Sequence, residues 1–356
     1  MEWLESILAS VFLLADGVGE GFVAIALGFA VKATGIGFLV GAALMLIFQS
    51  VAPISFQVES LTVISRRAKG DWRTMCYAVI LAGLVGAMLG AVGVYGALVT
   101  FIGEGIQGGM MMGAGLILTI VAIELLRESW KIGLLSGVVA IAVFLLVGDL
   151  VWALVASVGA CVILGRWVPS PAVISNPEIE KVSLVPRSWQ DLKFFKNPNV
   201  IRATLAILAL RTGTSIAYTA ICGEFAGVTT NFDMQNILIG ISGISSALFG
   251  GATLEPIVSP TAAAPLPIFS GVLFMALMGI ICLTGVLPKI GRWVPIPAVS
   301  GILIVIGAFI VIPENLSFVM QDPVAGGVTA AITAATMDPF LGMLVGLIVR
   351  AITGIV

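Results

Sequence analysis

Histidine is missing from this chain, and charged residues are scarce. The 356 residues include no histidine, and only 10% of them are Asp, Glu, Lys or Arg. A histidine metal site and a histidine proton relay are therefore excluded, so ion coupling would have to use carboxylates, hydroxyls or backbone groups. The four cysteines stand singly in apolar runs, without the spacing of a metal site or a disulfide framework.

A basic surface is absent as well. The net charge is −2 at pH 7, which is unlike the positively charged face of a nucleic-acid-binding protein. There is also no GxxxxGK[ST] phosphate loop, and no nucleophile–base pair typical of a membrane protease or transferase. We expect no nucleic-acid partner, no metal, no enzymatic activity and no cofactor, with H⁺ or Na⁺ as the candidate coupling ions.

Apolar residues dominate what remains. They make up 59% of the chain and form repeated runs close to the length that spans a bilayer. Such runs favour helices over the weak alternation of a membrane barrel. The pattern predicts an all-α, multi-pass protein of the cell membrane, with the lipid bilayer as its surroundings.

The apolar runs fall into two sets of seven, separated by a polar stretch at residues 165–198. An odd number of crossings in each half places the halves in opposite orientations, as in transporters built from inverted repeats. The first set covers residues 7–31, 36–50, 52–65, 74–100, 109–126, 131–148 and 150–164. The second covers residues 199–222, 235–250, 256–268, 270–287, 296–312, 322–336 and 339–355.

Two of these runs are interrupted at corresponding places. The stretch SALFGGATLEPIVSPTAAAPLPI (246–268) has a glycine pair, four prolines and the carboxylate Glu255. Its counterpart LIFQSVAPISFQVESLTVIS (46–65) breaks at a proline and then reaches Glu59. Irregular backbone at membrane depth persists only where protein buries it or where it lines a watery cavity. Segments 3 and 10 are therefore expected to be half-helices with a binding site between them.

Basic residues gather on one side of the predicted membrane. Of the 17 Lys and Arg residues, fifteen follow odd-numbered crossings, whereas the even loops carry acids such as Glu104 and Glu224. By the positive-inside rule the basic loops, including the 165–198 linker, are cytoplasmic. Both termini are then expected outside.

Several stretches resemble the nucleobase-ascorbate and adenine/guanine/hypoxanthine (xanthine/uracil) permeases. They are IGEGIQGGMMMGAGLIL (102–118), WVPIPAVSGILIVIGAFIV (293–311), SVAPISFQVES (50–60) and LFGGATLEPIVSPTAAAP (248–265). The resemblance implies a core domain (1–104 and 199–288) and a gate domain (105–164 and 289–356), with short strands back to back at segments 3 and 10. It also implies a nucleobase as substrate, a site between segments 3 and 10, and a homodimer formed through the gate domain.

The chain departs from that family at three points. Where the family carries an acid in segment 8, this chain has Arg211, and the family's segment-10 acid falls near Ser259, with Glu255 four residues earlier. The family's termini are cytoplasmic, opposite to the sidedness that the charges predict here.

Arg211 lies inside segment 8, where a cation needs a partner or a watery cavity. Asp16 aligns with it when the two halves are superposed. One interpretation is a structural ion pair between segments 1 and 8. The other is an anion site at Arg211, with Asp16 or Glu20 responding to a coupled proton or cation.

The two carboxylates at the breaks each have two interpretations. Glu59 is either an interfacial group near Arg66 or a coupling residue, and Glu255 either caps a half-helix or contacts substrate. Hydroxyl and amide groups near the breaks complete the candidate site. The predicted substrate-binding residues are Glu255, Arg211, Thr212, Thr214, Thr253, Ser259, Ser55 and Gln57, and the predicted coupling residues are Asp16, Glu20 and Glu59.

These features predict a secondary transporter of a small polar solute, most simply a nucleobase, working by movement of core against gate. One alternative is an anion carrier of the same fold, for sulfate-like or carboxylate anions, that uses Arg211. A second alternative is a membrane scaffold that does not transport.

Overall fold

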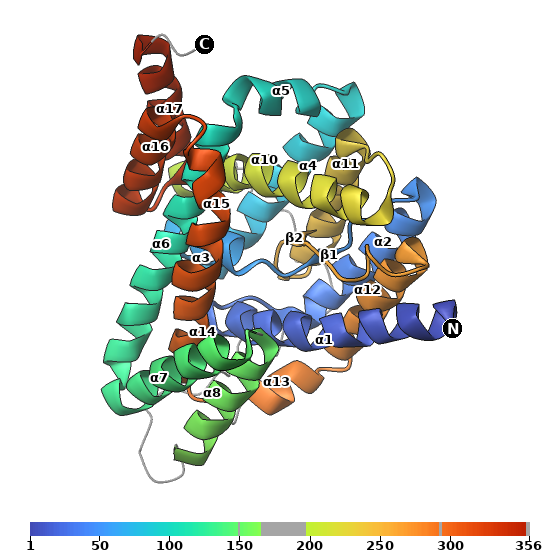
Figure 1. Ribbon diagram of the computed structural model, residues 1–356, viewed down its shortest axis with the longest axis vertical. Coiled ribbons are helices and arrows are strands. Elements are labelled where there is room, and N and C mark those ends of the chain that lie inside the picture. The colour runs from blue at the N-terminus through green and yellow to red at the C-terminus, as the bar shows by residue number, and fades with distance from the viewer. Residues whose placement is uncertain (149, 165–196, 292–293, 354–356) are drawn as a thin grey trace.

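The structure is a computed structural model that describes residues 1–148, 150–164, 197–291 and 294–353. Nearly all of the described chain is helical (Figure 1). The predicted linker 165–198 lies outside the described residues except for its last two positions.

The first half of the chain places a short strand and a short helix between longer helices. Its elements are α1 (Glu2–Ala26), α2 (Val31–Phe48), β1 (Ile54–Ser55), α3 (Val58–Arg67), α4 (Trp72–Val92), α5 (Tyr95–Ile102), α6 (Glu104–Glu128), α7 (Trp130–Val147) and α8 (Leu150–Leu164).

The second half places a short strand at the matching position and breaks one long helix into several parts. Its elements are α10 (Pro198–Ala226), α11 (Phe232–Ala247), β2 (Glu255–Pro256), α12 (Pro267–Leu283), α13 (Val286–Gly291), η2 (Ile296–Val299), α14 (Ser300–Ile304), η3 (Val305–Val311), α15 (Ile312–Val319), α16 (Pro323–Thr336) and α17 (Pro339–Thr353).

Helix lengths agree with a membrane location. Seven of the described helical stretches are long and apolar enough to cross a bilayer, and shorter apolar helices accompany them. The long stretches are Glu2–Ala26, Val31–Phe48, Trp72–Val92, Glu104–Glu128, Trp130–Val147, Pro198–Ala226 and Ile296–Val319. The chain is an integral, multi-pass membrane protein, as the apolar runs predicted.

Polar caps begin several helices where the sequence changes from loop to apolar run. The Asp71 carboxylate accepts hydrogen bonds from the backbone N–H of Arg73 and Thr74 at the start of α4. Asp322 does the same for Ala325 at the start of α16, where Pro323 occupies a first-turn position that lacks a helical N–H bond anyway. These caps satisfy backbone donors that a helix start leaves free.

Two arms make up the molecule (Figure 1). The core arm consists of α1–α4 and α10–α12, and the gate arm consists of α6–α8 and α14–α17. One hydrophobic cluster draws all its buried residues from the predicted core ranges 1–104 and 199–288, among them Phe38, Phe56 and Phe274. A second cluster joins gate residues to core residues such as Val58, Val63 and Leu210. The two-domain division remains a prediction that this packing fits.

The two predicted breaks meet as an antiparallel pair of two-residue strands. Ile54 is opposite Pro256 and Ser55 is opposite Glu255. Segment 3 then continues as the half-helix α3, as expected.

Segment 10 differs from the expectation of a second half-helix. Residues 257–266 are not helical: a turn at 260–263 and bends at 264–266 follow β2, with the N–H of Ala262 bonded to the carbonyl of Ser259. Pro260 and Pro265 explain the difference, because proline lacks the N–H donor that a helix interior uses. A continuous helix resumes only at Pro267. Among the described residues, only α3 therefore presents a half-helix N-terminus at the break.

The gate arm contains an irregular helix. The stretch from Ser300 to Val319 runs through the π-helical turn η3 before it reaches α15. At Gly307 a Cβ atom would stand 2.5 Å from the carbonyl oxygen of Gly115, so glycine permits this close approach to α6. The π-turn shifts the register of the following helix and sets which side chains of α15 face the core arm.

Candidate functional site

A buried ion pair joins segment 8 to the second break. The Arg211 Nη2 atom lies 2.8 Å from Glu255 Oε1, and its Nε lies 3.0 Å from Glu255 Oε2. Both side chains are 0% exposed. This two-point contact is the strong geometry of a guanidinium–carboxylate pair.

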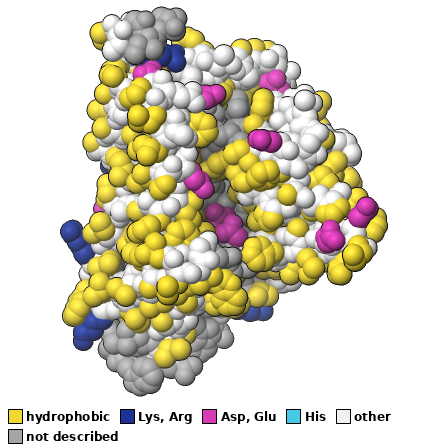
Figure 2. All heavy atoms as spheres, in the orientation of Figure 1, with side chains coloured by type: hydrophobic (Ala, Val, Ile, Leu, Met, Phe, Trp, Pro, Cys, Tyr) yellow, Lys and Arg dark blue, Asp and Glu magenta, His cyan; other side chains and the backbone are white. Residues whose placement is uncertain are grey.

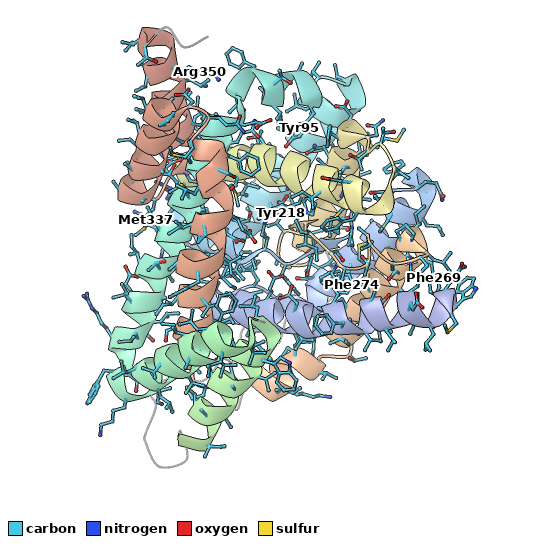
Figure 3. The ribbon with its side chains drawn as sticks, viewed as in Figure 1. Tyr95, Tyr218, Phe269, Phe274, Met337 and Arg350 are labelled. Atoms are coloured by element: carbon cyan, nitrogen blue, oxygen red, sulfur yellow. The ribbon has the colours of Figure 1, made fainter. Side chains whose placement is uncertain are left out.

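Neighbouring groups make further hydrogen bonds to both members of the pair. Thr253 Oγ1 donates to Glu255 Oε1 at 3.0 Å, and Arg211 Nη1 donates to the carbonyl of Ala82 at 3.3 Å. Tyr95, which Figure 3 labels, lies at the start of α5 and has both charges as electrostatic neighbours. With its charge matched and its side chain fully buried, Arg211 is not presented to an incoming anion in this conformation.

Two expectations about this pair need correction. Arg211 pairs with Glu255 rather than with Asp16, and Glu255 lies in β2 rather than capping a half-helix. Arg211 forms a buried ion pair, but with Glu255 and not with the residue that the superposition of the two halves aligned with it. The broken symmetry of segment 10 explains the error, because an extended β2 directs Glu255 toward α10.

A second polar group lies on α1, at the boundary between the arms. Ser55 Oγ, opposite Glu255 in the strand pair, donates to Glu20 Oε2 at 3.4 Å. Asp16 and Glu20 line a cavity of about 10 Å³ together with α8 and α14 side chains. That volume is close to what one water molecule needs. Three predicted residues are thus gathered where core and gate meet.

Glu59 belongs to the same region. It sits in the first turn of α3 and is 6% exposed. Its electrostatic neighbours include Glu314 and Asp16, and it accepts a hydrogen bond from its own backbone N–H. The interfacial interpretation is wrong, because Arg66 pairs with Glu124 of α6 and leaves Glu59 inside the protein.

Two further residues near this region, Tyr218 of α10 and Glu314 of α15, are not among the predicted substrate-binding or coupling residues. Tyr218 has Glu59, Glu314 and Glu20 as its charged neighbours, and it lies near the middle of the molecule (Figure 3). The only signal for Glu314 was an acid at the end of an apolar run, which also marks ordinary loops. Its position depends on the π-turn, which the sequence pattern did not indicate.

The remaining predicted residues either make hydrogen bonds within their own helix or lie at the two breaks. Thr212 donates to the carbonyl of Ala209 in its own helix, as membrane hydroxyls often do. Ser259 bonds with Thr261 in the segment-10 turns, and Gln57 is the N-cap residue of α3. Thr214 belongs to α10, but its side chain lies outside the described residues.

A larger hollow separates the arms beside these groups. Figure 2 shows it with acidic side chains at its floor. Between α6, α10 and α15 lies a cavity of about 210 Å³, lined among others by Glu104, Gln107, Met111, Ala220, Asn315 and Phe318. Its lining combines apolar side chains with two amides and one carboxylate, which is typical of a small-molecule site. Within the described ranges, no set of three Asp, Glu, Cys or His side chains converges as metal ligands would.

Ion pairs join the two arms near the end of α6, away from this cavity at its start. Arg66 of α3 pairs with Glu124 of α6. Arg67 pairs with Asp338 at 3.3 Å and donates to the carbonyl of Met337 at 2.7 Å. We call these contacts of Arg66 and Arg67 the basic-face latch.

Comparisons with known proteins identify the fold. No protein-family model matches the chain, and no curated protein is similar to it in sequence. Solved structures match over nearly its whole length. The transmembrane domain of a cyanobacterium bicarbonate transporter, BicA, has a TM-score of 0.59 and 18% identity, covering 96% of this chain and 98% of that one.

Two further matches are structures of SLC26A9. The overall structure of SLC26A9 has a TM-score of 0.65 and 10% identity, covering 95% of this chain and 64% of that one. The murine Slc26a9 anion transporter, in its inward-facing state, has a TM-score of 0.69 and 13% identity, covering 99% of this chain and 68% of that one.

At these identities the likeness shows the fold alone. The predicted seven-plus-seven inverted-repeat fold is confirmed. The nucleobase-ascorbate family is not named among these matches, which include a bicarbonate transporter and an anion transporter.

Proposed function

We propose that this protein is a secondary transporter that moves a small polar solute by movement of the core arm against the gate arm. The observation that carries the proposal is the hollow between the arms. A cavity lies between α10 of the core arm and α6 and α15 of the gate arm, near the start of α6, whereas the basic-face latch joins the arms near the end of α6. Alternating access in inverted-repeat transporters works around a site placed in this way.

The side chains favour a neutral solute rich in N–H donors, such as a nucleobase. Glu20 and Glu59 supply carboxylate acceptors, and the first N–H groups of α3 supply donors. A purine or pyrimidine edge carries matching donors and acceptors. Arg211, the group that motivated an anion substrate, is already occupied by Glu255.

An anion is the second candidate substrate, and the fold neighbours favour it. Those neighbours are a bicarbonate transporter and an anion transporter. Here an anion would bind at the α3 N-terminus, where the helix dipole is favourable, rather than at Arg211. The nearby carboxylates oppose a free anion, so we expect an anion to bind together with H⁺ or Na⁺.

A thermal-shift screen tests these substrates. A ligand that binds only the folded protein raises its apparent Tm. We expect nucleobases to stabilise the purified protein. The double variant Glu20→Gln and Glu59→Gln should lower the affinity for the nucleobase at least tenfold, because both carboxylate acceptors are altered. Glu5→Gln is the matched control, because Glu5 lies on α1 like Glu20 but is exposed and lines neither cavity between the arms.

Other results of the screen would redirect the proposal. Stabilisation by bicarbonate, chloride or sulfate alone would replace the nucleobase with an anion. A protein that is stabilised by no solute and carries none in proteoliposomes would be a non-transporting scaffold.

The basic-face latch gives a separate prediction for the motion. Arg67→Gln removes one ion pair and the hydrogen bonds to the carbonyls of Met337 and Thr336. We expect the population to shift several-fold toward the state in which the hollow is closed. The measurement is the rate at which a maleimide labels Ala220→Cys in the hollow, which should fall. Lys69→Gln, a neighbouring exposed cation outside the latch, should leave the rate unchanged; equal effects of the two variants would argue against a latch.

A further inference from the structure

The cavity of about 210 Å³ between α6, α10 and α15 is separate from the predicted substrate site. None of the predicted substrate-binding or coupling residues lines it. Its polar side chains are Glu104 and Gln107 of α6 and Asn315 of α15, and no Lys or Arg is among the described residues that line it. Arg350 of α17, near the start of α6, donates instead to the carbonyl of Ile102 at 2.8 Å.

The two amide side chains present their oxygen atoms to this cavity. Gln107 Nε2 donates to the carbonyl of Val99 at 2.9 Å, and Asn315 Nδ2 donates to the carbonyl of Val311 at 2.9 Å. These bonds fix both amide orientations, because an amide oxygen cannot donate to a carbonyl. Neither amide oxygen accepts a hydrogen bond from the described residues, and neither is sealed from the cavity. Both are therefore acceptors available to a ligand.

Glu104 adds a negative charge to these acceptors. Its Oε2 accepts a hydrogen bond from Gln321 Nε2 at 2.6 Å, which leaves Oε1 without a donor among the described residues. Glu104 is exposed, whereas Gln107, one helical turn further along α6, is buried. The carboxylate thus lies at the accessible end of the cavity and the amide oxygen lies deeper. A group that bonds to both must carry several donors, and a positive charge strengthens each bond.

The rest of the lining is apolar. Met111, Ile221 and Phe318 contribute side chains, and the face of an aromatic ring such as that of Phe318 attracts cations. At about 210 Å³ the cavity is below the range of roughly 300–1,000 Å³ that is typical of drug-sized ligands. It therefore suits a molecule with one ring or a short apolar chain.

We propose that this cavity binds a small organic cation, with a protonated amine directed at Glu104, Gln107 and Asn315 and an apolar body against Met111 and Phe318. An ammonium group has three donors and no acceptor, which matches a lining that offers acceptors alone. A carboxylate or an inorganic anion would meet only acceptors and a like charge. The inference goes beyond the proposed function, because this ligand need not be the transported solute.

The test compares three probes that share one ring: benzylammonium, benzyl alcohol and benzoate. Their affinities for the purified full-length protein are measured by isothermal titration calorimetry at neutral pH. We expect benzylammonium to bind at least about tenfold more tightly than benzyl alcohol, because charged donors form the stronger hydrogen bonds. Benzoate should not bind.

Three variants test the assigned contacts. Glu104→Gln removes the charge, and Asn315→Leu removes an acceptor at similar size, so each should weaken benzylammonium binding several-fold. Asn315 donates only to a carbonyl of its own helical stretch, so this change leaves the contacts between the arms intact. Glu224→Gln is the matched control, since Glu224 is an exposed acid at the end of α10 that does not line the cavity. It should bind benzylammonium like the wild type.

Protection from labelling locates the ligand. Ala220 lines the cavity and is exposed, whereas Cys76, Cys161, Cys222 and Cys282 are buried, so a maleimide should react mainly with Ala220→Cys. Saturating benzylammonium should slow this reaction several-fold, and benzoate should not.

Three results would overturn the proposal. They are benzoate binding as tight as that of benzylammonium, an affinity unchanged by both Glu104→Gln and Asn315→Leu, and benzylammonium that does not bind or does not protect Ala220→Cys. The nucleobase screen is independent of these results. A protein that binds benzylammonium here but no nucleobase would keep this site and lose the proposed substrate, and the reverse pattern would remove only this site.

Discussion

Arg211→Ala is expected to destabilise the protein by about 3–5 kcal/mol, since it leaves Glu255 buried without its counter-charge. Glu255→Ala should have a similar effect, because it leaves a fully buried guanidinium that only a carbonyl and a hydroxyl contact. The measurement is thermal unfolding in detergent, compared between variants under the same conditions. Arg202→Ala is the matched control: Arg202 lies on the same helix but is exposed, and it should stay within about 0.5 kcal/mol of the wild type.

The double variant distinguishes a structural pair from a substrate site. Arg211→Met combined with Glu255→Met removes both charges and keeps side-chain volume, so most of the lost stability should return. A double variant as unstable as either single variant would contradict this account of the pair. A stable Arg211→Ala that no longer binds anions would instead restore Arg211 as a substrate residue.

In intact cells an impermeant maleimide should label a cysteine on the outer membrane face and should not label one on the inner face. Positions 69 and 224 provide this comparison. α4 and α10 run in the same direction, because Thr204 contacts Ala78 near their starts and Tyr95 contacts Asp233 beyond their ends. Lys69 precedes α4, and Glu224 lies at the end of α10. By the positive-inside rule we expect an impermeant maleimide to label Glu224→Cys and not Lys69→Cys.

This experiment also decides which way the hollow opens. The cavity between the arms is lined by Ala220 and Ile221, near the end of α10, so it opens toward the Glu224 face. Labelling of Glu224→Cys would therefore place the open hollow outside the cell. The opposite pattern, supported by a reporter fused after Val356 that is active only in the cytoplasm, would make both termini cytoplasmic and refute the predicted sidedness.

The membrane class, the segment pattern and the two breaks were readable from the residues alone. Each follows from local chemistry: an apolar run must span the bilayer, and a proline-rich interruption must be buried or line a cavity. The two interruptions were identified in the same way, at SVAPISFQVES and LFGGATLEP, and the structure pairs them as two short strands.

The pairing of charges was decided only by the tertiary structure. Repeat symmetry aligned Arg211 with Asp16, whereas the structure pairs Arg211 with Glu255. Pro260 and Pro265 break that symmetry, because segment 10 stays extended and turned instead of helical, and this brings Glu255 to Arg211. The position of Glu314 likewise depends on the π-turn η3 directly before α15, which no local pattern predicted. Local patterns specify where the backbone breaks, but long-range packing specifies which side chains the breaks bring together.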